Sequence, residues 1–309
     1  MEHESVSVLI GSRNRPQVVR TCIESVRCQM APELSEILVL DDGSDCEYAD
    51  EYASLVHLDV RIRCLRVEEP LGVAGGRNYL MRAANGTIMF FIDDDAVLST
   101  PTSVAAAVQA FQSDDILGIV AGKIINHRDG REDLLVPFSR RTRRRSPSII
   151  DARQIVSYYL GTCHAIHRRV IETVGHYQED LVFGEEELDL AYRAINAGFR
   201  IVYLPTLVAH HYPHPSVVKA RGVAHRTELY HHVRNRFLLA WKYLPARYVV
   251  VYLTIWLSIY AWDAVRQSAI RDYLRGILHG IRTLGAQRRQ VIRPEAISYL
   301  RRYHGRLWY

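Results

Sequence analysis

The sequence predicts an α/β fold with a mostly parallel central sheet, helices on both faces of that sheet, and a helical extension at the C-terminus. Short apolar runs alternate with helical patterns over about the first 125 residues, and this alternation is typical of doubly wound sheets. Beyond residue 215 the pattern is helical throughout. A chain of 309 residues, 48% hydrophobic and 24% charged, is long enough for a substantial core and is not typical of disorder. We therefore expect a sheet-bearing domain at residues 1–215 and a helical region at residues 216–309.

Strands are expected where the short apolar runs occur, at residues 6–10, 36–40, 62–67, 88–92, 116–125, 162–166 and 201–204. Helical patterns fill the gaps between them. One helix opens near Pro16, one runs toward Ala84, one lies near Arg169, and one ends at Gly198. Residues 128–147 are polar and basic and contain two prolines, which predicts an exposed loop.

Three consecutive aspartates, Asp93, Asp94 and Asp95, directly follow the apolar run at residues 88–92. Such a run is typical of a buried strand in a parallel sheet, and open α/β sheets bind ligands at the carboxyl ends of their strands. Carboxylate oxygens are preferred ligands of Mg²⁺ and Mn²⁺, so a divalent cation would relieve the repulsion between these side chains. A solvated acidic turn is the simpler explanation of the three aspartates taken alone.

Asp41 and Asp42 follow the second strand and precede Gly43 and Ser44, so their carboxylates reach the same edge of the sheet. A carboxylate at that position can accept a hydrogen bond from the imide of uracil or thymine. An Asx turn followed by a helix N-cap uses the same residue types, and the pattern does not separate the two explanations.

A glycine-rich loop at residues 71–78 opens a helix and includes Gly72 and Arg77. It matches neither the GxGxxG pattern nor the Walker A sequence, which argues against a dinucleotide-binding protein and against a P-loop nucleotide hydrolase. Its glycines permit close backbone approach, and the helix N-terminus together with Arg77 offers positive potential for an anion. Ser12 and Arg15, after the first strand, add hydrogen-bond donors to that edge. Either segment could instead be an ordinary polar loop.

Four carboxylates occur within five positions at the start of a predicted helix, at Glu185, Glu186, Glu187 and Asp189. Acidic residues in a first turn complement the helix dipole by about 0.3–1 kcal/mol each, but this effect does not account for four of them. Clustering raises the proton affinity of at least one carboxylate, as a general base requires.

Two adjacent histidines, His210 and His211, stand just after the strand at residues 201–204. A neutral imidazole there could complete a metal shell begun by Asp95. Because the chain contains 14 histidines, a chance pair is the simpler explanation of this feature alone.

In this order, the segments resemble the family 2 glycosyltransferases, which are inverting enzymes of the GT-A fold, and in particular bacterial rhamnosyltransferase-like members. The resemblance covers about residues 5–211. It rests on residues 8–15, 40–44 and 72–78, on the Asp93-Asp94-Asp95 version of the DxD motif, and on residues 184–190 with Gly198 and the histidine pair.

The resemblance implies a site. The residues that would bind the nucleotide sugar are Ser12, Arg15, Asp41, Asp42, Gly72, Arg77, Asp93 and Asp94. The residues that would hold Mg²⁺ or Mn²⁺ are Asp93, Asp95, His210 and His211. Glu187 would be the catalytic base, and Glu186 competes with it because family members usually carry Glu-Asp at these two positions.

The resemblance also implies a reaction, a metal-dependent single displacement from a UDP- or dTDP-sugar to an acceptor hydroxyl, with inversion of the anomeric centre. The acceptor would be a glycan, a lipid-linked intermediate or a small molecule, in the biosynthesis of a cell-surface polysaccharide, a glycolipid or a natural product. No covalent nucleophile is required, and no activated serine or cysteine is evident.

Two other functions compete with this one. A sugar-1-phosphate nucleotidyltransferase would share the sheet, the glycine loop and the metal carboxylates, but it carries a GxGTR-like signature where this chain has Gly-Ser-Arg-Asn-Arg-Pro at residues 11–16. A non-enzymatic nucleic-acid-binding protein could use the basic cluster at residues 140–145. Acidic clusters repel phosphate backbones, so we expect no nucleic-acid partner.

The segment at residues 248–262 is apolar nearly all round, and Asp263 and Arg266 are predicted to end it before the roughly 20 residues that a bilayer span needs. Its tyrosines, tryptophans and flanking arginines suit a membrane interface, and packing inside the protein or in a homo-oligomer explains it equally well. Five cysteines without a regular framework and an N-terminus without an export signal predict a cytoplasmic protein, with peripheral contact at the inner membrane face.

Overall fold

The computed structural model describes residues 4–128, 130–213, 225–284, 288–305 and 307. The strands are β1 (Val6–Ser12), β2 (Leu34–Asp42), β3 (Ile62–Val67), β4 (Ile88–Ile92), β5 (Ala96–Leu98), β6 (Leu117–Arg128), β7 (Arg131–Leu135), β8 (Gln154–Val156), β9 (Cys163–His167) and β10 (Arg200–His211). The main helices are α1 (Pro16–Arg27), α2 (Ala49–Ser54), α3 (Gly72–Ala83), α4 (Ser103–Gln112), α5 (Arg140–Arg145), α6 (Arg168–Val174), α7 (Glu186–Asn196), α9 (His225–Tyr243), α10 (Ala246–Arg266), α11 (Ile270–Leu284) and α12 (Pro294–Arg302). Each expected strand is present, and β3 and β4 have the predicted bounds.

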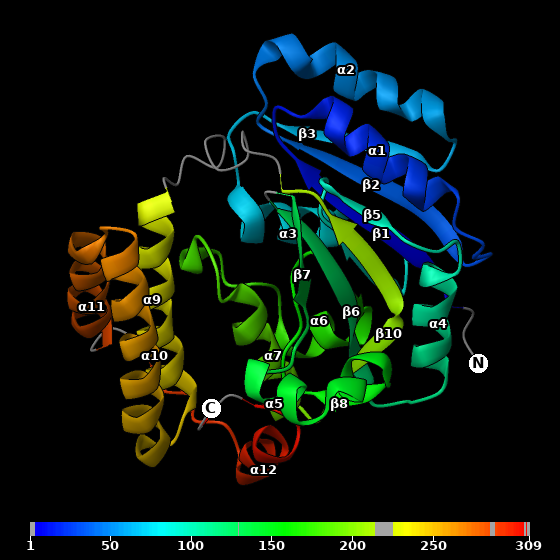
Figure 1. Ribbon diagram of the computed structural model, residues 1–309. Helices are drawn as coiled ribbons and strands as arrows, with labels where there is room; N and C mark the ends of the chain where they lie inside the picture. Colours follow the sequence, from blue (N-terminus) through cyan, green and yellow to red (C-terminus); the bar gives the residue numbers. More distant parts are fainter. Residues whose placement is uncertain (1–3, 129, 214–224, 285–287, 306, 308–309) are drawn as a thin grey trace.

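The strands form one sheet in the order β3, β2, β1, β4, β9, β6, β10 and β5, with β7 paired to β6 and β8 paired to β10 (Figure 1). β1 pairs in parallel with both β2 and β4, and Ser12 lies opposite Asp41. The carboxyl ends of these three strands therefore meet at one edge. All five residues of β4 are buried, as expected for a strand covered on both faces. The predicted α/β class is confirmed. The sheet is mixed, because β9 runs antiparallel to β4 and β6, and β5, β7 and β8 also pair antiparallel to their neighbours.

Two apolar cores lie on the two faces of the sheet. One contains side chains of α1 and α4, and the other contains side chains of α3, α6 and α7. The second core continues into the C-terminal helices, since Leu188 of α7 belongs to the same cluster as Phe237 of α9, Trp256 of α10 and Leu300 of α12. These helices are therefore packed against the sheet-bearing part of the chain. The expected boundary between residues 215 and 216 lies outside the described residues.

The expected loop at residues 128–147 is more ordered than its composition predicts. Residues 131–135 form β7, which pairs with the end of β6, and residues 140–145 form α5. The hydroxyl of Ser139 accepts a hydrogen bond from the backbone N–H of Thr142 at 3.1 Å and caps this short helix. The composition of this segment did not predict β7, because this strand forms by pairing with the end of the long strand β6.

The apolar segment near the C-terminus is longer than expected. α10 has 21 residues, and an 18-residue window within it has a mean hydropathy of 1.5, so by length and composition it could cross a membrane. Asp263 and Arg266 lie in its last turn and do not end it early. One of its faces is nevertheless packed inside the protein, through Tyr248, Tyr252 and Trp256. The sequence offered internal and interfacial explanations for this segment, and the helix has one face suited to each.

Candidate active site

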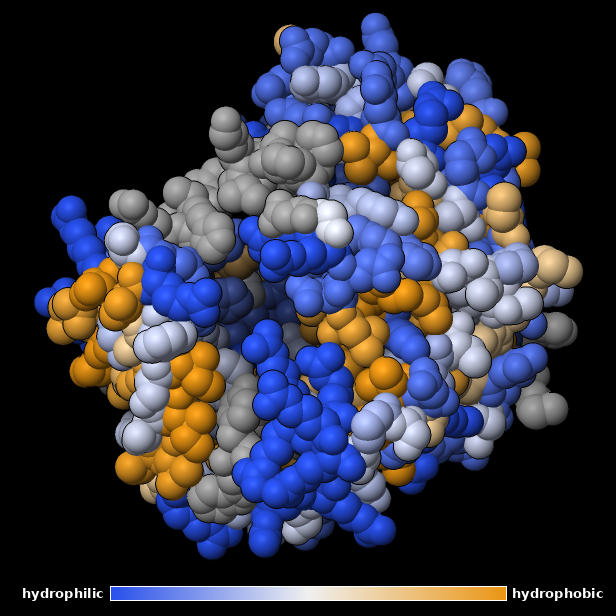
Figure 2. Space-filling view, viewed as in Figure 1, coloured by the Kyte–Doolittle hydropathy of each residue, from blue (hydrophilic) through white to orange (hydrophobic). Residues whose placement is uncertain are grey.

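A cavity of about 580 Å³ lies at the carboxyl edge of the parallel strands. Figure 2 shows the surface hollowed between α9 and the sheet. The sequence-predicted residues that line the cavity are Ser12, Arg15, Asp42, Gly72, Arg77, Asp93, Asp94, Glu186 and Glu187. They come from the ends of β1, β2 and β4 and from the starts of α1, α3 and α7. The predicted residues that do not line it are Asp41, Asp95, His210 and His211.

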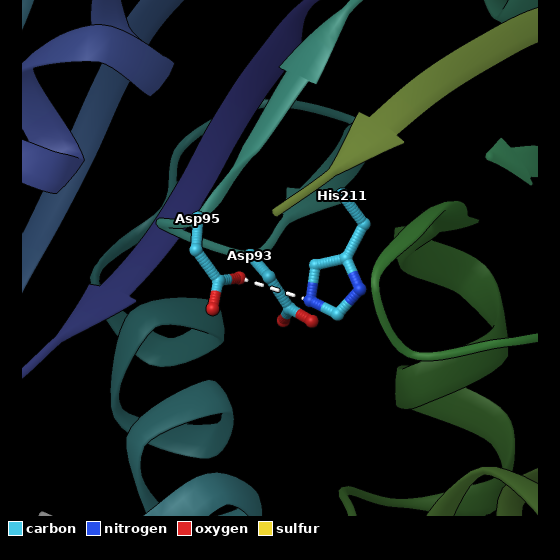
Figure 3. Close-up of side chains that lie close together, drawn as sticks. All are labelled: Asp93, Asp95 and His211. Carbon is cyan, nitrogen blue, oxygen red and sulfur yellow. Dashed lines mark ion pairs between the residues drawn. The ribbon is translucent and has the colours of Figure 1, made fainter. Parts of the chain in front are cut away.

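Asp93, Asp95 and His211 form a cluster beside the cavity. Their ligand atoms lie within 4.8 Å of one another, and the three side chains point toward one another in Figure 3. His211 Nε2 lies 3.1 Å from Asp95 Oδ1, while His211 Nδ1 lies 2.8 Å from Asn126 Oδ1. In the tautomer whose Nδ1–H donates a hydrogen bond to Asn126 Oδ1, the lone pair of Nε2 faces the carboxylates. A metal ligand requires this tautomer.

His210 is not placed to join this cluster, which corrects the prediction that either histidine could be a ligand. Successive side chains of a strand point to opposite faces, so only one of two adjacent histidines in β10 can face Asp95. The ring of His210 stacks on His127, and His210 Nδ1 lies 2.8 Å from His127 Nε2.

Arg15 offsets the charge of the two buried aspartates. Its guanidinium lies 2.8 Å from Asp94 Oδ1 and 3.3 Å from Asp95 Oδ2. Burial nevertheless raises the pKa of Asp94, because the Arg15 charge only partly compensates for lost hydration and for the neighbouring carboxylates. The aspartate cluster therefore favours additional positive charge.

Arg77 lies between the aspartates and the acidic start of α7. Its Nη1 atom is 2.8 Å from Glu187 Oε1 and 3.4 Å from Glu186 Oε1, and its Nη2 atom is 3.7 Å from Asp93 Oδ1. The backbone of Gly161 passes close by, and a Cβ there would lie 2.1 Å from Glu187 Oε1. Gly161 was not recognised in the sequence, because it belongs to no motif and its role depends on a contact distant in the chain.

Glu186 differs from Glu187 in its surroundings. Its Oε2 atom is buried and has no hydrogen-bond partner among the described residues. Burial is the largest cause that raises the pKa of Glu186, the Glu187 charge adds to it, and Arg77 opposes it. A carboxyl group with a raised pKa and an unpartnered oxygen, on a residue that lines a cavity, is a candidate to accept a proton from a ligand.

The two aspartates after β2 have separate roles in the structure. Asp42 lines the cavity, and its carboxylate accepts hydrogen bonds from the backbone N–H groups of Leu71 and Gly72, at 2.7 and 3.0 Å, at the start of α3. Asp41 is buried, accepts from the N–H of Ser44 at 2.9 Å and pairs with Arg66. For Asp41 the Asx-turn explanation therefore describes what its side chain does.

The four carboxylates of the acidic helix start divide in a similar way. Glu186 and Glu187 line the cavity, whereas Glu185 and Asp189 face α9. Arg236 Nη2 lies 2.7 Å from Glu185 Oε2, and the hydroxyl of Tyr243 donates to Asp189 Oδ1 at 2.6 Å.

Asn235 of α9 holds the loop that precedes α7. Its side-chain amide donates to the carbonyls of Leu181, Phe183 and Gly184 at 2.8, 3.0 and 2.8 Å. The loop needs this support because Val182 and Glu185, neither of them glycine, have φ angles of +60° and +74°. Asn235 is fully buried, and sequence reasoning missed it because its partners are backbone atoms about 50 residues away.

The fold and the site together define a transferase of the GT-A type. The structure resembles a mannosyltransferase from Pyrobaculum calidifontis solved with GDP-Man and Mn²⁺, with a TM-score of 0.58, 17% identity, and coverage of 98% of this chain and 75% of that one. It also resembles S. aureus TarS solved with UDP-GlcNAc, with a TM-score of 0.57, 16% identity, and coverage of 75% and 65%. These likenesses show the shared fold.

The chain belongs to glycosyl transferase family 2, whose family model matches residues 7–175. It is 27% identical over 217 residues to the pre-mycofactocin glycosyltransferase of Mycobacterium tuberculosis, covering 67% of this chain and 43% of that protein. It is 20% identical over 281 residues to YfnE, an uncharacterized glycosyltransferase of Bacillus subtilis, covering 74% and 71%. The chain thus spans less than half the length of the mycobacterial relative. The predicted class of enzyme, a glycosyltransferase, is confirmed.

Proposed function

We propose that this glycosyltransferase moves a sugar from a nucleoside-diphosphate donor to an acceptor hydroxyl by a single inverting displacement. The observation that carries the proposal is the position of Arg77 in one cavity, within ion-pairing distance of both Asp93 and Glu187. The groups proposed to hold the donor and the group proposed to activate the acceptor therefore share one space.

The donor proposal rests on the positive groups of the cavity. The N-terminal turn of α3 and the guanidinium groups of Arg15 and Arg77 can bind a diphosphate, and Asp42 and Ser12 lie where a nucleoside could be recognised. Two structural neighbours were solved in complex with GDP-Man and with UDP-GlcNAc, which supports a nucleotide sugar, and we propose a UDP- or dTDP-sugar. The acceptor class stays a prediction, as does the biosynthetic pathway.

The cluster of Asp93, Asp95 and His211 fits Mg²⁺ or Mn²⁺. Two carboxylates and one imidazole are suitable donors for such ions, and Asn126 fixes the orientation of the imidazole. The charge of the cavity argues in the same direction. Among the described residues that line it are six carboxylates and three guanidinium groups, yet the proposed donor is itself anionic. A bound cation would supply positive charge that offsets the negative charge developing on the departing diphosphate.

The proposed base is Glu187. Its carboxylate takes the proton of the acceptor hydroxyl while the acceptor oxygen attacks the anomeric carbon, and the bond between that carbon and the diphosphate oxygen breaks with both electrons going to the diphosphate. Attack opposite the leaving group inverts the centre. Glu186 is the second candidate, because its Oε2 atom is buried without a hydrogen-bond partner in the described chain.

A panel of nucleoside-diphosphate sugars, each tested with and without Mn²⁺, provides the test. We expect one donor to raise the melting temperature of the protein only when Mn²⁺ is present, because a ligand that binds the folded state selectively stabilises it. The same donor should then release free nucleoside diphosphate in the presence of an acceptor, with inverted product detected by NMR. Stabilisation by sugar-free nucleosides alone, without any effect of the diphosphate or the cation, would contradict the proposal.

A further inference from the structure

The outer face of α10 and α11 is apolar and largely exposed. On α10, Val250, Trp262 and Val265 are exposed by 69%, 65% and 63%. On α11, Leu274, Leu278 and Ile281 are exposed by 51%, 53% and 52%. Figure 2 shows hydrophobic surface at the left of the molecule, where Figure 1 places these two helices. Folded monomers rarely expose contiguous apolar patches of this kind unless the patch has a partner. We call these six residues the α10/α11 face.

The apolar side chains of α11 cannot turn inward, because its inner face is already occupied. Gly276 and Gly280 lie directly against α9, where an added Cβ at Gly276 would be 2.9 Å from Val233 Cβ and one at Gly280 would be 2.7 Å from Phe237 Cβ. At about 100° per residue, Leu278 lies about 180° around the helix from these two glycines. The packing of α11 against α9 therefore leaves this side of α11 exposed.

Positive charge borders the apolar surface. Residues 246–284 contain five arginines, two aspartates, and neither lysine nor glutamate. At the same spacing around the helix, Arg271, Arg275 and Arg282 lie within about 60° of Leu278, and all three are exposed. An apolar stripe flanked by arginines, with a tryptophan among its members, is typical of a helix that lies in the interface of an anionic membrane.

We propose that the α10/α11 face docks on the surface of a bilayer that contains anionic lipids. The apolar side chains would enter the boundary between headgroups and acyl chains, and the arginines would meet the lipid phosphates. A second copy of this chain is a poorer occupant, because a symmetric contact would bring the same arginines together. The proposal is independent of the donor chemistry, since none of these residues lines the cavity.

Vesicle flotation of the whole chain tests the proposal. We expect the wild-type protein to float with vesicles rich in phosphatidylglycerol, and to float much less with vesicles of phosphatidylcholine alone. The double variant Leu274→Glu, Leu278→Glu should lose flotation, because it places charge in the centre of the face. A matched control is the double variant Met30→Glu, Val60→Glu, which changes two exposed apolar residues elsewhere and should float like the wild type.

Melting curves of both double variants establish that they fold, and the double variant Arg271→Gln, Arg275→Gln measures the arginine contribution. This variant should lose most of the preference for anionic vesicles. The proposal is overturned if the wild type does not float with either kind of vesicle, or if the Leu274, Leu278 variant floats as well as the wild type. It is also overturned if light scattering shows a dimer that this variant converts to monomers, because the face then joins two copies of the chain.

Discussion

Arg77 and Glu187 form a 2.8 Å ion pair inside the cavity, although 110 residues separate them in the chain. The same guanidinium lies 3.7 Å from Asp93, so it touches both the predicted donor side and the predicted acceptor side. A diphosphate that binds Arg77 must compete with Glu187 for it. We therefore expect donor binding to loosen the hold of Arg77 on the proposed base, which would link the arrival of the donor to activation of the acceptor.

Replacing Arg77 should weaken donor binding. Arg77→Ala removes a buried cation from among several carboxylates, and we expect the dissociation constant for UDP or dTDP to rise about tenfold or more, which corresponds to about 1.4 kcal/mol. Arg77→Lys should lose less, because it keeps the charge but not the planar fork. Calorimetric titration measures the effect. Arg82→Ala, on the same helix but mainly solvent-exposed, is the control, and equal affinities for all three variants would contradict the prediction.

Replacing Asp95 should remove the effect of the metal on nucleotide binding. Asp95→Ala takes away one of the three proposed ligand groups, so we expect Mn²⁺ to strengthen UDP or dTDP binding in the wild type and to have no effect in the variant. Titration with and without Mn²⁺ measures this difference. Asp115→Ala changes an exposed aspartate and should behave like the wild type. Full retention of the Mn²⁺ effect in Asp95→Ala would show that the cation binds elsewhere.

Replacing the proposed base should separate donor binding from sugar transfer. Glu187→Gln keeps the size of the side chain but cannot take a proton. We expect donor affinity at least as high as that of the wild type, because the diphosphate loses a charged competitor for Arg77, and transfer slowed by about 100-fold or more. Glu186→Gln should retain most of its transfer activity. The two rates are compared under saturating donor. If Glu186→Gln shows the greater loss, the base is Glu186, as its unpartnered oxygen would allow.

Glu186 should also make the stability of the fold depend on pH. Burial raises its pKa in the folded state to about 7, whereas an unfolded glutamate has a pKa of about 4.3. The folded state therefore binds this proton more tightly, so the contribution to stability is present at low pH and is lost as the pH rises between those two values. Relative to the wild type, Glu186→Gln should gain melting temperature from about pH 5 to about pH 8. The melting temperatures of both proteins are measured across this pH range without added metal. If the difference between them does not change with pH, the assignment is contradicted.

Asn235 should matter for transfer although it does not line the cavity. Asn235→Ala leaves three carbonyls of the loop at residues 181–184 without their donor, and each unsatisfied buried group costs about 1–3 kcal/mol. We expect a lower melting temperature, and transfer that falls more than donor affinity does, because α7 starts from this loop. Ser298→Ala, which removes only an exposed hydrogen bond within α12, is the control. A loss of stability with unchanged transfer per folded molecule would mean that Asn235 is structural only.

The sequence predicted the sheet well, because its central strands are continuous apolar runs with carboxylates or polar groups directly after them. The chain crosses the sheet repeatedly in the same direction, so residues at successive strand ends, such as Ser12, Asp42 and Asp93, necessarily meet. Motif order was therefore enough to predict which segments share the cavity. The short strands β5, β7 and β8 were missed, because each is held mainly by the edge of a longer partner.

Other parts of the site could not be predicted from a single sequence. The pattern His210-His211 does not reveal which ring faces Asp95, because that depends on the register of β10 against β5 and β6. The roles of Asp41 and Asp42 likewise follow from which of them reaches Arg66 and which reaches the start of α3. Gly161 and Asn235 act through contacts with atoms far along the chain, and no local spacing marks them.

The hydrogen bonds between α9 and the loop before α7 limit how this enzyme could be re-engineered. Asn235 and Arg236 belong to the C-terminal helices, yet they contact residues 181–185, which directly precede α7 and the proposed base. A chimera that exchanges these helices for those of a relative would have to carry compatible side chains at both positions. Otherwise we expect the exchanged enzyme to fold with Glu187, the proposed base, out of position, while the proposed nucleotide-binding residues keep theirs.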